Sequence, residues 1–240
     1  MRVTIVRERA RVDPRVVRFS DLEPMTTERF RPPQQHRSQE TLDRILDAAE
    51  RILDAKSFTE ATLVEIMEAA GVTVGAFYRR FPDKDALLHL MDERFFSELY
   101  ERGDAVLDPA RWPDQPIADV LREFTREAVD IYRGRRGLLR SLLLRARLDP
   151  LIQERARQVN AHLIANLHAV LLPRAAGIRH PDPERAIELG YMILVGSLRE
   201  TTLFSEVWPT PNVVDTIDLP EELTRVYLGY LGAQSRVPVR

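Results

Sequence analysis

TLVEIMEAAGVTVGAFYRRFPDKDALL, residues 62–88, is the stretch that decides how this chain folds. Thr62 is followed three residues later by a glutamate, which is the spacing of a capping box at the start of a helix. Gly71 then supplies a residue that can turn with positive φ, and Thr73 can cap a second short helix. Pro82 ends that helix, because the residue before a proline avoids helical geometry. Two short helices joined by a glycine turn predict a helix-turn-helix.

Amphipathic helices flank this motif on both sides. Upstream, apolar residues recur at helical spacing from Ser38 onward, with charged residues on the other face. Downstream, Asp83 can cap a further helix that runs to about Tyr100. We therefore predict one folded unit over residues 38–100, with the helix-turn-helix at 62–81.

The composition excludes several classes of protein. The chain has 240 residues, of which 44% are hydrophobic and 30% are charged, and this balance is typical of a globular protein. It has no cysteine, which excludes disulfides, thiolate zinc sites and cysteine nucleophiles. No apolar stretch approaches the roughly 20 residues that a membrane helix needs, and the N-terminus lacks the apolar core of a signal peptide. We therefore expect a cytoplasmic protein without a membrane partner.

Charge is distributed unevenly along the chain. The formal net charge is −2, yet residues 1–37 carry nine arginines against five acids. This segment has no sustained period and contains several prolines, so we predict a flexible basic arm over 1–37. Because the rest of the chain is acidic, contact with nucleic acid must be confined to a small basic face.

Residues 62–88 resemble the DNA-binding signature of the TetR family of transcriptional regulators almost residue for residue. The resemblance includes the Ala-Ala-Gly-Val turn at 69–72, whereas Met67 and Arg80 stand where the family usually has a small residue and a histidine. It implies an all-α fold: an N-terminal three-helix helix-turn-helix domain followed by a C-terminal helical domain, residues 101–240, for dimerisation and effector binding. It also implies a repressor that a small-molecule effector releases from its operator.

The second helix of the motif has the residues that a recognition helix needs. Small and polar side chains at its start can approach base edges, and cationic and hydroxyl groups follow within reach of phosphates. Gly75 costs about 1 kcal/mol relative to alanine inside a helix, which close approach to DNA would justify, although it could instead be a packing glycine. Arg79 could equally be a solvated surface arginine, and Arg37 could lie in a minor groove or in solvent. The candidate DNA-binding residues are Arg37, Thr62, Thr73, Val74, Gly75, Ala76, Tyr78, Arg79, Arg80 and Lys84.

Hydrophobic periodicity predicts further helices beyond this domain. They span approximately residues 116–133, 135–148, 150–173, 183–205 and 219–232. The helix at 183–205 has a thin face of small residues that would let another helix approach closely, and the family resemblance implies dimerisation through the last two helices. Packing within one subunit is the alternative reading of that face. The candidate dimer-interface residues are Gly190, Ile193, Gly196, Ser197 and Tyr227.

The resemblance also implies an effector pocket in the helical domain. The candidates to line it are Phe124, Tyr132, Asn166, His168 and Tyr191, although buried aromatic residues more often belong to a core.

We expect three partners: double-stranded operator DNA, a second copy of the chain and a small-molecule effector. The sequence has no nucleophile elbow, phosphate-binding loop or zinc-protease motif, so we expect no enzymatic activity, cofactor or metal. The alternatives are a helical protein-interaction module and a regulator that responds to no small molecule.

Overall fold

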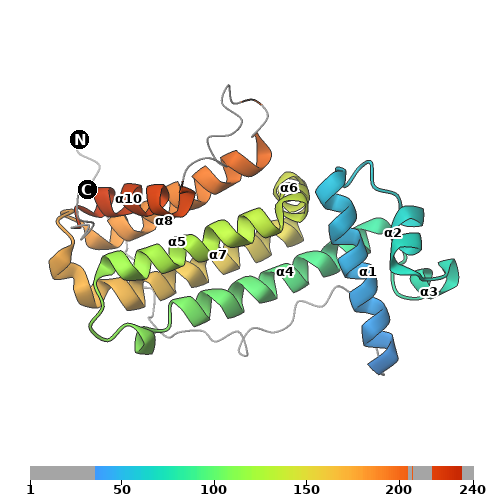
Figure 1. Cartoon of the computed structure of the whole chain (residues 1–240), viewed down its shortest axis with the longest axis horizontal. Coiled ribbons are helices and arrows are strands. Elements are labelled where there is room, and N and C mark those ends of the chain that lie inside the picture. Colours follow the sequence, from blue (N-terminus) through green and yellow to red (C-terminus); the bar gives the residue numbers. More distant parts are fainter. Residues whose placement is uncertain (1–35, 205–206, 208–217, 234–240) are drawn as a thin grey trace, which may run out of the picture.

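The described residues form an elongated, entirely helical molecule with a small domain at one end. The computed structural model describes residues 36–204, 207 and 218–233, and every regular element in these ranges is a helix. Figure 1 shows the small domain on the right and a bundle of long helices on the left. The all-α class predicted from the sequence is therefore confirmed. Most of the arm predicted at 1–37 lies outside the described residues.

The small domain consists of α1 (His36–Ala55), α2 (Leu63–Ala70) and α3 (Val74–Tyr78). The predicted capping box begins α2: the Thr62 hydroxyl accepts from the Glu65 N–H at 3.2 Å, and the Glu65 carboxylate accepts from the Thr62 N–H at 2.9 Å. Gly71 ends α2 with φ 62°, a left-handed conformation that a side chain would disfavour. This turn aims α3 away from α2, so the geometry is that of a helix-turn-helix.

Two phenylalanines anchor α3 to the rest of the domain. Phe77 and Phe81 are completely buried, and their ring centroids lie 5.2 Å apart. Thr73 caps α3 by accepting a hydrogen bond from the Ala76 N–H at 3.2 Å. Because Phe77 fills the inward side, the opposite side of α3 remains open to solvent.

The fourth helix, α4 (Lys84–Val106), joins the small domain to the bundle. Asp83 caps it as predicted, accepting from the Ala86 N–H at 2.7 Å. The helix continues six residues past Tyr100, where the sequence analysis placed the domain boundary. It continues because Gly103 and Val106 are buried, so the last turns still have a face to pack against the bundle. At the other end of the domain, α1 begins two residues before the predicted Ser38.

The bundle consists of α5 (Ile117–Gly134), α6 (Arg136–Arg145), α7 (Pro150–Leu171), α8 (Pro183–Leu203) and α10 (Leu219–Leu231). A short 3₁₀ turn at Pro109–Arg111 lies between α4 and α5, and another at Leu172–Gly177 lies between α7 and α8. These bounds agree closely with the helices expected from periodicity, which confirms those helices. None of the helices in the described part of the chain combines the length and apolar character that a bilayer crossing requires.

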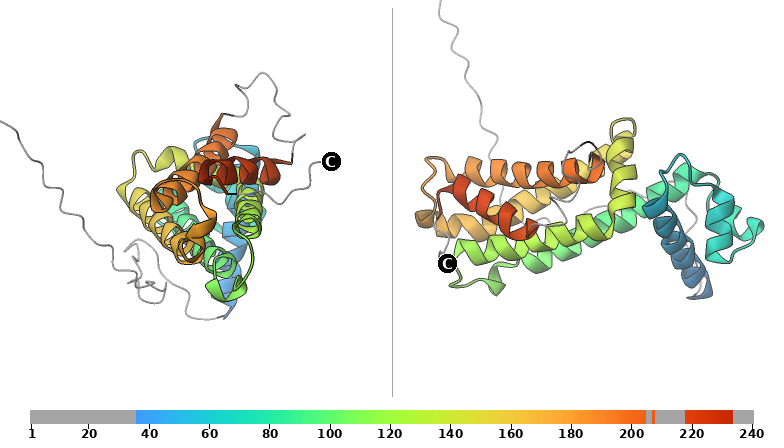
Figure 2. Two further views of the ribbon diagram at one scale, coloured as in Figure 1. Left: turned by 90° about the vertical axis from the view of Figure 1, so that its left-hand side faces the viewer. Right: turned by 45° about the horizontal axis from the view of Figure 1, so that its top comes forward.

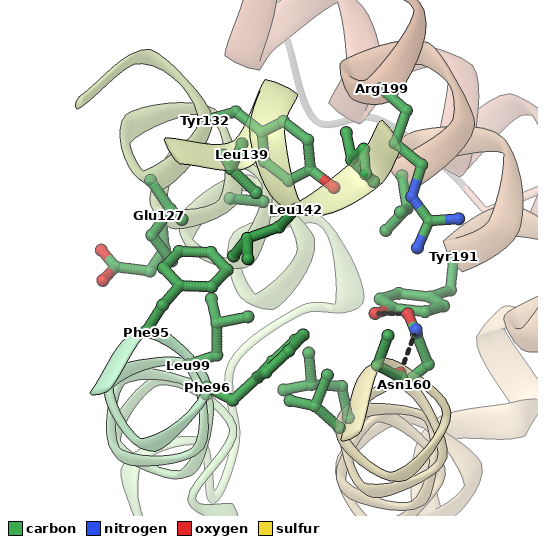
Figure 3. A pocket seen from close by; sticks show the side chains of 18 of the residues that line it. Phe95, Phe96, Leu99, Glu127, Tyr132, Leu139, Leu142, Asn160, Tyr191 and Arg199 are labelled. Carbon is green, nitrogen blue, oxygen red and sulfur yellow. Dashed lines mark hydrogen bonds between the residues drawn. The ribbon is translucent and has the colours of Figure 1, made fainter. Parts of the chain in front are cut away.

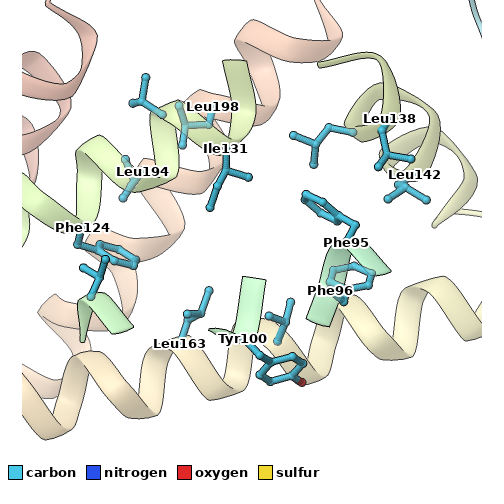
Figure 4. Close-up of a cluster of buried hydrophobic side chains, with 14 of the residues drawn as sticks. Phe95, Phe96, Tyr100, Phe124, Ile131, Leu138, Leu142, Leu163, Leu194 and Leu198 are labelled. Carbon is cyan, nitrogen blue, oxygen red and sulfur yellow. The ribbon is translucent and has the colours of Figure 1, made fainter. Parts of the chain in front are cut away.

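The bundle encloses one apolar core that continues into the small domain. Figure 2 shows α10 lying across α5 and α8, and α4 running beside α7. Figure 4 shows aromatic rings of α4 and α5 meeting leucines of α6, α7 and α8. This packing holds five helices around a common interior, which is the part of the fold that can form a cavity.

A close contact between α6 and α1 joins the bundle to the small domain. A Cβ atom at Gly137 would overlap the backbone of Leu53 and Asp54, so the two helices approach as only glycine allows. The Gly137 N–H also donates to the Asp54 carboxylate at 3.2 Å. The small domain is therefore held to the bundle through α6 as well as through α4.

Candidate nucleic-acid interface and cavity

The exposed side of α3 presents most of the residues predicted to read DNA bases. Thr73 and Gly75 are exposed, and the side chains of Val74 and Tyr78 are 60% and 50% exposed. A Cβ atom at Gly75 would meet nothing within 4 Å, so this glycine is not required by packing inside the protein. Ala76 is half-buried, at the edge of the same surface. Another molecule can therefore approach the backbone of α3 closely.

The predicted phosphate-binding cations divide into two groups. Arg79 is exposed, and its side chain makes no hydrogen bond or ion pair within the described residues. Arg80 instead turns inward, where its guanidinium donates to the Ser38 hydroxyl at 2.9 Å and to the Ala76 carbonyl at 3.0 Å. Arg80 thus ties α3 to the first turns of α1. The side chain of Arg37 is outside the described residues.

Lys84 also has partners inside the small domain. Its ammonium group donates to the carbonyl oxygens of Phe58 and Ala61 and lies 4.4 Å from the centroid of the Phe58 ring. Partial burial lowers the pKa of Lys84, and the nearby acids Asp85 and Glu65 oppose that effect. Lys84 therefore stabilises the loop before α2. The Thr62 side chain forms the N-terminal cap of α2. The phosphate contacts expected of Arg80 and Lys84 stay predictions.

A cavity of about 100 Å³ lies inside the bundle, between α4, α5, α6, α7 and α8. Figure 3 shows it from nearby. Phe124, Tyr132 and Tyr191, three of the residues predicted for an effector pocket, line the cavity. Most of the remaining wall is apolar, with the α4 rings Phe95 and Phe96 on one side. The sequence does not predict these two rings as pocket residues, because they belong to the segment predicted as one folded unit over residues 38–100.

Two residues predicted for the pocket do not line it. Asn166 lies on the same stripe of α7 as Leu163 but beyond the end of the cavity, where its amide donates to the Asp104 carboxylate at 2.7 Å. His168 is on another face of α7, with its Nε2 atom 3.8 Å from Glu188. Assigning Asn166 and His168 to the cavity was therefore wrong, since spacing along one helix does not reveal where the bundle closes.

A polar cluster forms one end of the cavity. The Tyr191 hydroxyl donates to the Asn160 side-chain carbonyl at 2.7 Å, and the Arg199 guanidinium lies beside the Tyr132 phenol (Figure 3). Burial raises the pKa of both tyrosines, so both phenols are neutral near pH 7. Asn160 and Arg199 were not among the residues predicted for the pocket. Arg199 could have been found, because it is eight residues after Tyr191 and so on the same side of α8.

A second hollow, of about 580 Å³, lies outside the cavity between α7 and α8. The two hollows share four residues, namely Asn160, Tyr191, Val195 and Arg199. These residues are therefore the wall between the inner cavity and the outer surface. The outer hollow also reaches Gly196, one of the candidate dimer-interface residues.

The predicted dimer-interface residues lie on two different faces. Gly190 packs against Tyr227 within the same protomer: a Cβ atom at Gly190 would overlap the tyrosine ring. Tyr227 is 2% exposed and donates to the Ile187 carbonyl at 2.6 Å. Assigning Gly190 and Tyr227 to a dimer interface was therefore wrong, because both are already buried between α8 and α10 of one subunit.

The other three candidates remain on the outer face of α8. Gly196 is exposed, and a Cβ atom there would meet nothing within 4 Å. Ile193 and Ser197 are half-buried beside it, and Met192 is 62% exposed. A second helix could contact this face without displacing any side chain of the protomer.

A chain of ion pairs runs from the cavity wall to α1. Glu127, which lines the cavity, pairs with Arg102, whose guanidinium also lies 3.1 Å from Glu98 on α4. Glu98 in turn pairs at 2.6 Å with Arg135, which also pairs with Glu50 on α1. Charged contacts therefore connect α5, α4 and the α5–α6 junction to the small domain.

Comparison with known proteins places the small domain among DNA-binding domains. Residues 45–91 match the family described as "Bacterial regulatory proteins, tetR family". The chain is 33% identical over 114 residues to the HTH-type transcriptional regulator AcrR of Shigella flexneri, covering 44% of this chain and 49% of the relative. It is 29% identical over 123 residues to the HTH-type transcriptional regulator TtgR of Pseudomonas putida, covering 51% and 49%. The chain thus spans about half the length of the curated relatives it matches.

The likeness of fold extends over most of the chain. The structure of the TetR family transcriptional regulator PfmR from Thermus thermophilus superimposes with a TM-score of 0.58. That alignment covers 81% of this chain and 100% of the other at 19% sequence identity. The similarity at this identity is one of fold, and it includes the helical bundle as well as the small domain.

Proposed function

We propose that this chain is a regulator of the TetR family, which its N-terminal domain resembles, and that it represses transcription as a ligand-responsive homodimer. The observation that carries the proposal is the open side of α3, where Gly75 leaves the backbone accessible. In a dimer, two such helices would enter successive major grooves of a pseudo-palindrome, with half-sites roughly 34–36 Å apart.

Selection of bound fragments from the genome of the source organism tests this proposal. The recovered fragments should share a pseudo-palindromic sequence, and binding to it should weaken steeply as salt is added. Binding without any shared sequence would contradict the proposed function. Failure to bind duplex DNA at low salt would favour a protein-interaction module instead.

Arg79 is the cation best placed to contact a phosphate, because it is exposed and unpaired within the described residues. We expect Arg79→Ala to weaken binding to all DNA sequences by a similar factor and to lower the salt slope by about one unit. Fluorescence anisotropy at several salt concentrations measures both effects. Arg126→Ala on α5 is the control, since Arg126 is exposed and pairs with Glu123 far from α3. An unchanged slope for Arg79→Ala would remove this residue from the interface.

The outer face of α8 is the proposed dimer face, and Gly196 provides a clean test of it. Gly196→Leu should leave the protomer folded, since the new side chain meets open space, but it should separate the subunits by a clash at the helix pairing. Gly134→Leu is the matched control, because Gly134 is also helical and open but lies at the end of α5. Sedimentation equilibrium should give monomers for the first variant and dimers for the second. An intact dimer of Gly196→Leu would refute this placement.

The cavity is the proposed effector site, and α4 is the proposed connector to DNA. This helix starts beside α3, lines the cavity with Phe95 and Phe96, and spans roughly 34 Å at 1.5 Å per residue. A ligand that tilts α4 would change the separation of the two recognition helices. The ion pairs from Glu127 to Glu50 offer a second contact between the cavity wall and α1.

Reciprocal coupling is the expected result for such a switch. An effector should loosen operator binding by about 5–150-fold, and operator DNA should weaken effector binding by the same factor. Calorimetric titrations with and without the other ligand measure both factors. A compound that occupies the cavity tightly and leaves operator affinity unchanged would show that the cavity is not a switch.

A further inference from the structure

Arg199 is an unusual residue to find at the end of an apolar cavity. Its Nε atom is buried and has no hydrogen-bond partner among the described residues. The residue as a whole is half-buried, but a buried donor atom of a cation is normally paired, because removing it from water is costly. The same protein shows the normal arrangement at Arg155, which lies 2.8 Å from the carboxylate of Asp92.

No group in the described lining of the cavity balances the charge of Arg199. Glu127 is the acid that contributes to the lining, but its carboxylate points away from the cavity in Figure 3 and pairs with Arg102. The neighbouring phenols of Tyr132 and Tyr191 are neutral near pH 7, because burial raises their pKa values. The guanidinium is therefore a positive group with unused donor capacity at the wall of the cavity.

The hydrogen bonds already made within the protein at this end of the cavity limit which donors a ligand can bind. Tyr191 donates its proton to Asn160, and the Asn160 amide donates to the Ala156 carbonyl. Both groups thus already use a donor within the protein. The Tyr132 hydroxyl can still donate, because the adjacent guanidinium has no acceptor of its own and can bind only to its oxygen lone pairs. The donors best placed for a ligand thus belong to Arg199 and Tyr132.

The opposite part of the cavity is apolar and offers no second polar anchor among the described residues. Phe95, Phe96, Leu99 and Leu142 face the interior from α4 and α6. A ligand that fills this part must expose a hydrocarbon surface to it. Its polar group must then point to the end formed by α5, α7 and α8.

We propose that the effector is a compact organic carboxylate, whose apolar body fills the cavity and whose carboxylate binds Arg199 with the Tyr132 hydroxyl as a second donor. A planar guanidinium matches the two oxygens of a carboxylate, and the charges compensate each other away from water. This inference rests on the proposed use of the cavity as the effector site. It adds the chemical class of the ligand, which neither the family match nor the similar regulators supply.

Matched acid and alcohol pairs test the charge requirement directly. We suggest isovalerate with 3-methylbutanol and benzoate with benzyl alcohol, which are small enough for a cavity of about 100 Å³, titrated calorimetrically into the full chain at about pH 7.5 without DNA. The wild-type protein should bind each acid at least about 10-fold more tightly than its alcohol, as expected for a charge-assisted contact of more than about 1.4 kcal/mol. Because DNA is absent, the result does not depend on whether the protein regulates transcription.

Three variants assign the preference to the proposed residues. Arg199→Met should abolish the preference for the acid, Arg199→Lys should keep part of it, and Tyr132→Phe should reduce it. Arg185→Met is the control, since Arg185 lines only the outer hollow and its side chain is 76% exposed. Circular dichroism and thermal unfolding establish that each variant is folded.

Several results would overturn the inference. Equal binding of acid and alcohol by the wild-type protein would refute the charge requirement while leaving the cavity as an effector site. Retained preference in a folded Arg199→Met would place the carboxylate elsewhere. Absence of binding by every acid and every alcohol would refute this ligand class, and genomic fragment selection would still decide independently whether the chain is a DNA-binding regulator.

Discussion

Replacing Gly75 with leucine is expected to reduce operator binding to the non-specific level, a loss of about 10³-fold or more. Gly75 lies on the exposed side of α3, where a Cβ atom meets nothing within the protein. The leucine side chain would therefore project from the recognition helix and keep its backbone away from the base edges. Fluorescence anisotropy with the selected operator and with an unrelated duplex measures the specific and the non-specific component.

The same substitution should leave the fold intact, which makes the result interpretable. Leucine is favoured over glycine within a helix by up to about 1 kcal/mol, so the free energy of unfolding should be unchanged or slightly higher. Gly134→Leu, at the other open helical glycine used above, should leave operator binding unchanged. If Gly75→Leu bound the operator as tightly as the wild-type protein, α3 could not approach DNA through this surface.

Replacing Arg155 with methionine is expected to lower the free energy of unfolding by about 3–5 kcal/mol near pH 8, because it leaves a buried carboxylate without its cation. Asp92 is completely buried on α4, and Arg155 of α7 lies 2.8 Å from it. Arg155 also donates to the His89 carbonyl at 3.1 Å, so the side chain joins α7 to the first half of α4. Urea unfolding followed by circular dichroism measures the change.

The loss should depend on pH in a defined direction. Burial raises the pKa of Asp92 from its usual value of 3.8 to about 6, although the hydrogen bond and charge of Arg155 oppose the increase. A raised pKa in the folded state means that the contribution of Asp92 to stability is present below about 3.8 and is lost as pH rises through about 6. Without Arg155 the pKa of Asp92 rises further, so the variant should lose less stability at pH 5 than at pH 8.

Arg157→Met provides the matched control for this prediction. Arg157 is on the same helix, two residues later, and pairs with Glu154 at the surface with 67% of its side chain exposed. An exposed pair of this kind contributes at most about 1 kcal/mol, so its removal should have a small effect with little pH dependence. The contact of 2.6 Å between His89 and Asp149 is kept in all three proteins, so it cancels in the comparison. A loss at Arg155→Met that did not change with pH would contradict the role assigned to Asp92.

Much of the helix-turn-helix could be predicted because its signals act over a few residues. The Thr62 cap, the Gly71 turn and the Asp83 cap each depend on groups within four positions, and the structure contains all three. The later helices were also predictable, since an amphipathic period is visible in any window of two or three turns. The end of α4 was not, because its last turns are stabilised by α7, about 60 residues away, where Leu163 packs against Gly103.

The orientation of long side chains was the least predictable part of the candidate sites. Arg80 and Lys84 have the composition and spacing of phosphate-binding cations, yet both donate to groups inside the domain. The partner of Arg80 is Ser38, which is 42 positions earlier in the chain. Gly190 was predicted to face another subunit, yet it packs inside its own protomer. A small residue on an apolar helix indicates close packing but does not reveal whether the partner is α10 or another subunit.

The sequence by itself determined the helices, their caps and the helix-turn-helix, because these depend on hydrogen bonds and periodicity within one segment. Only the tertiary structure decided which face of each helix meets its own bundle, which cations remain free and where the cavity lies. Those properties depend on packing between helices far apart in the chain. Arg199 shows the difference: its place on α8 could be read from its spacing to Tyr191. Only the structure shows that its Nε atom is buried without an acceptor, at the wall of a cavity that residues of α5 and α7 also line.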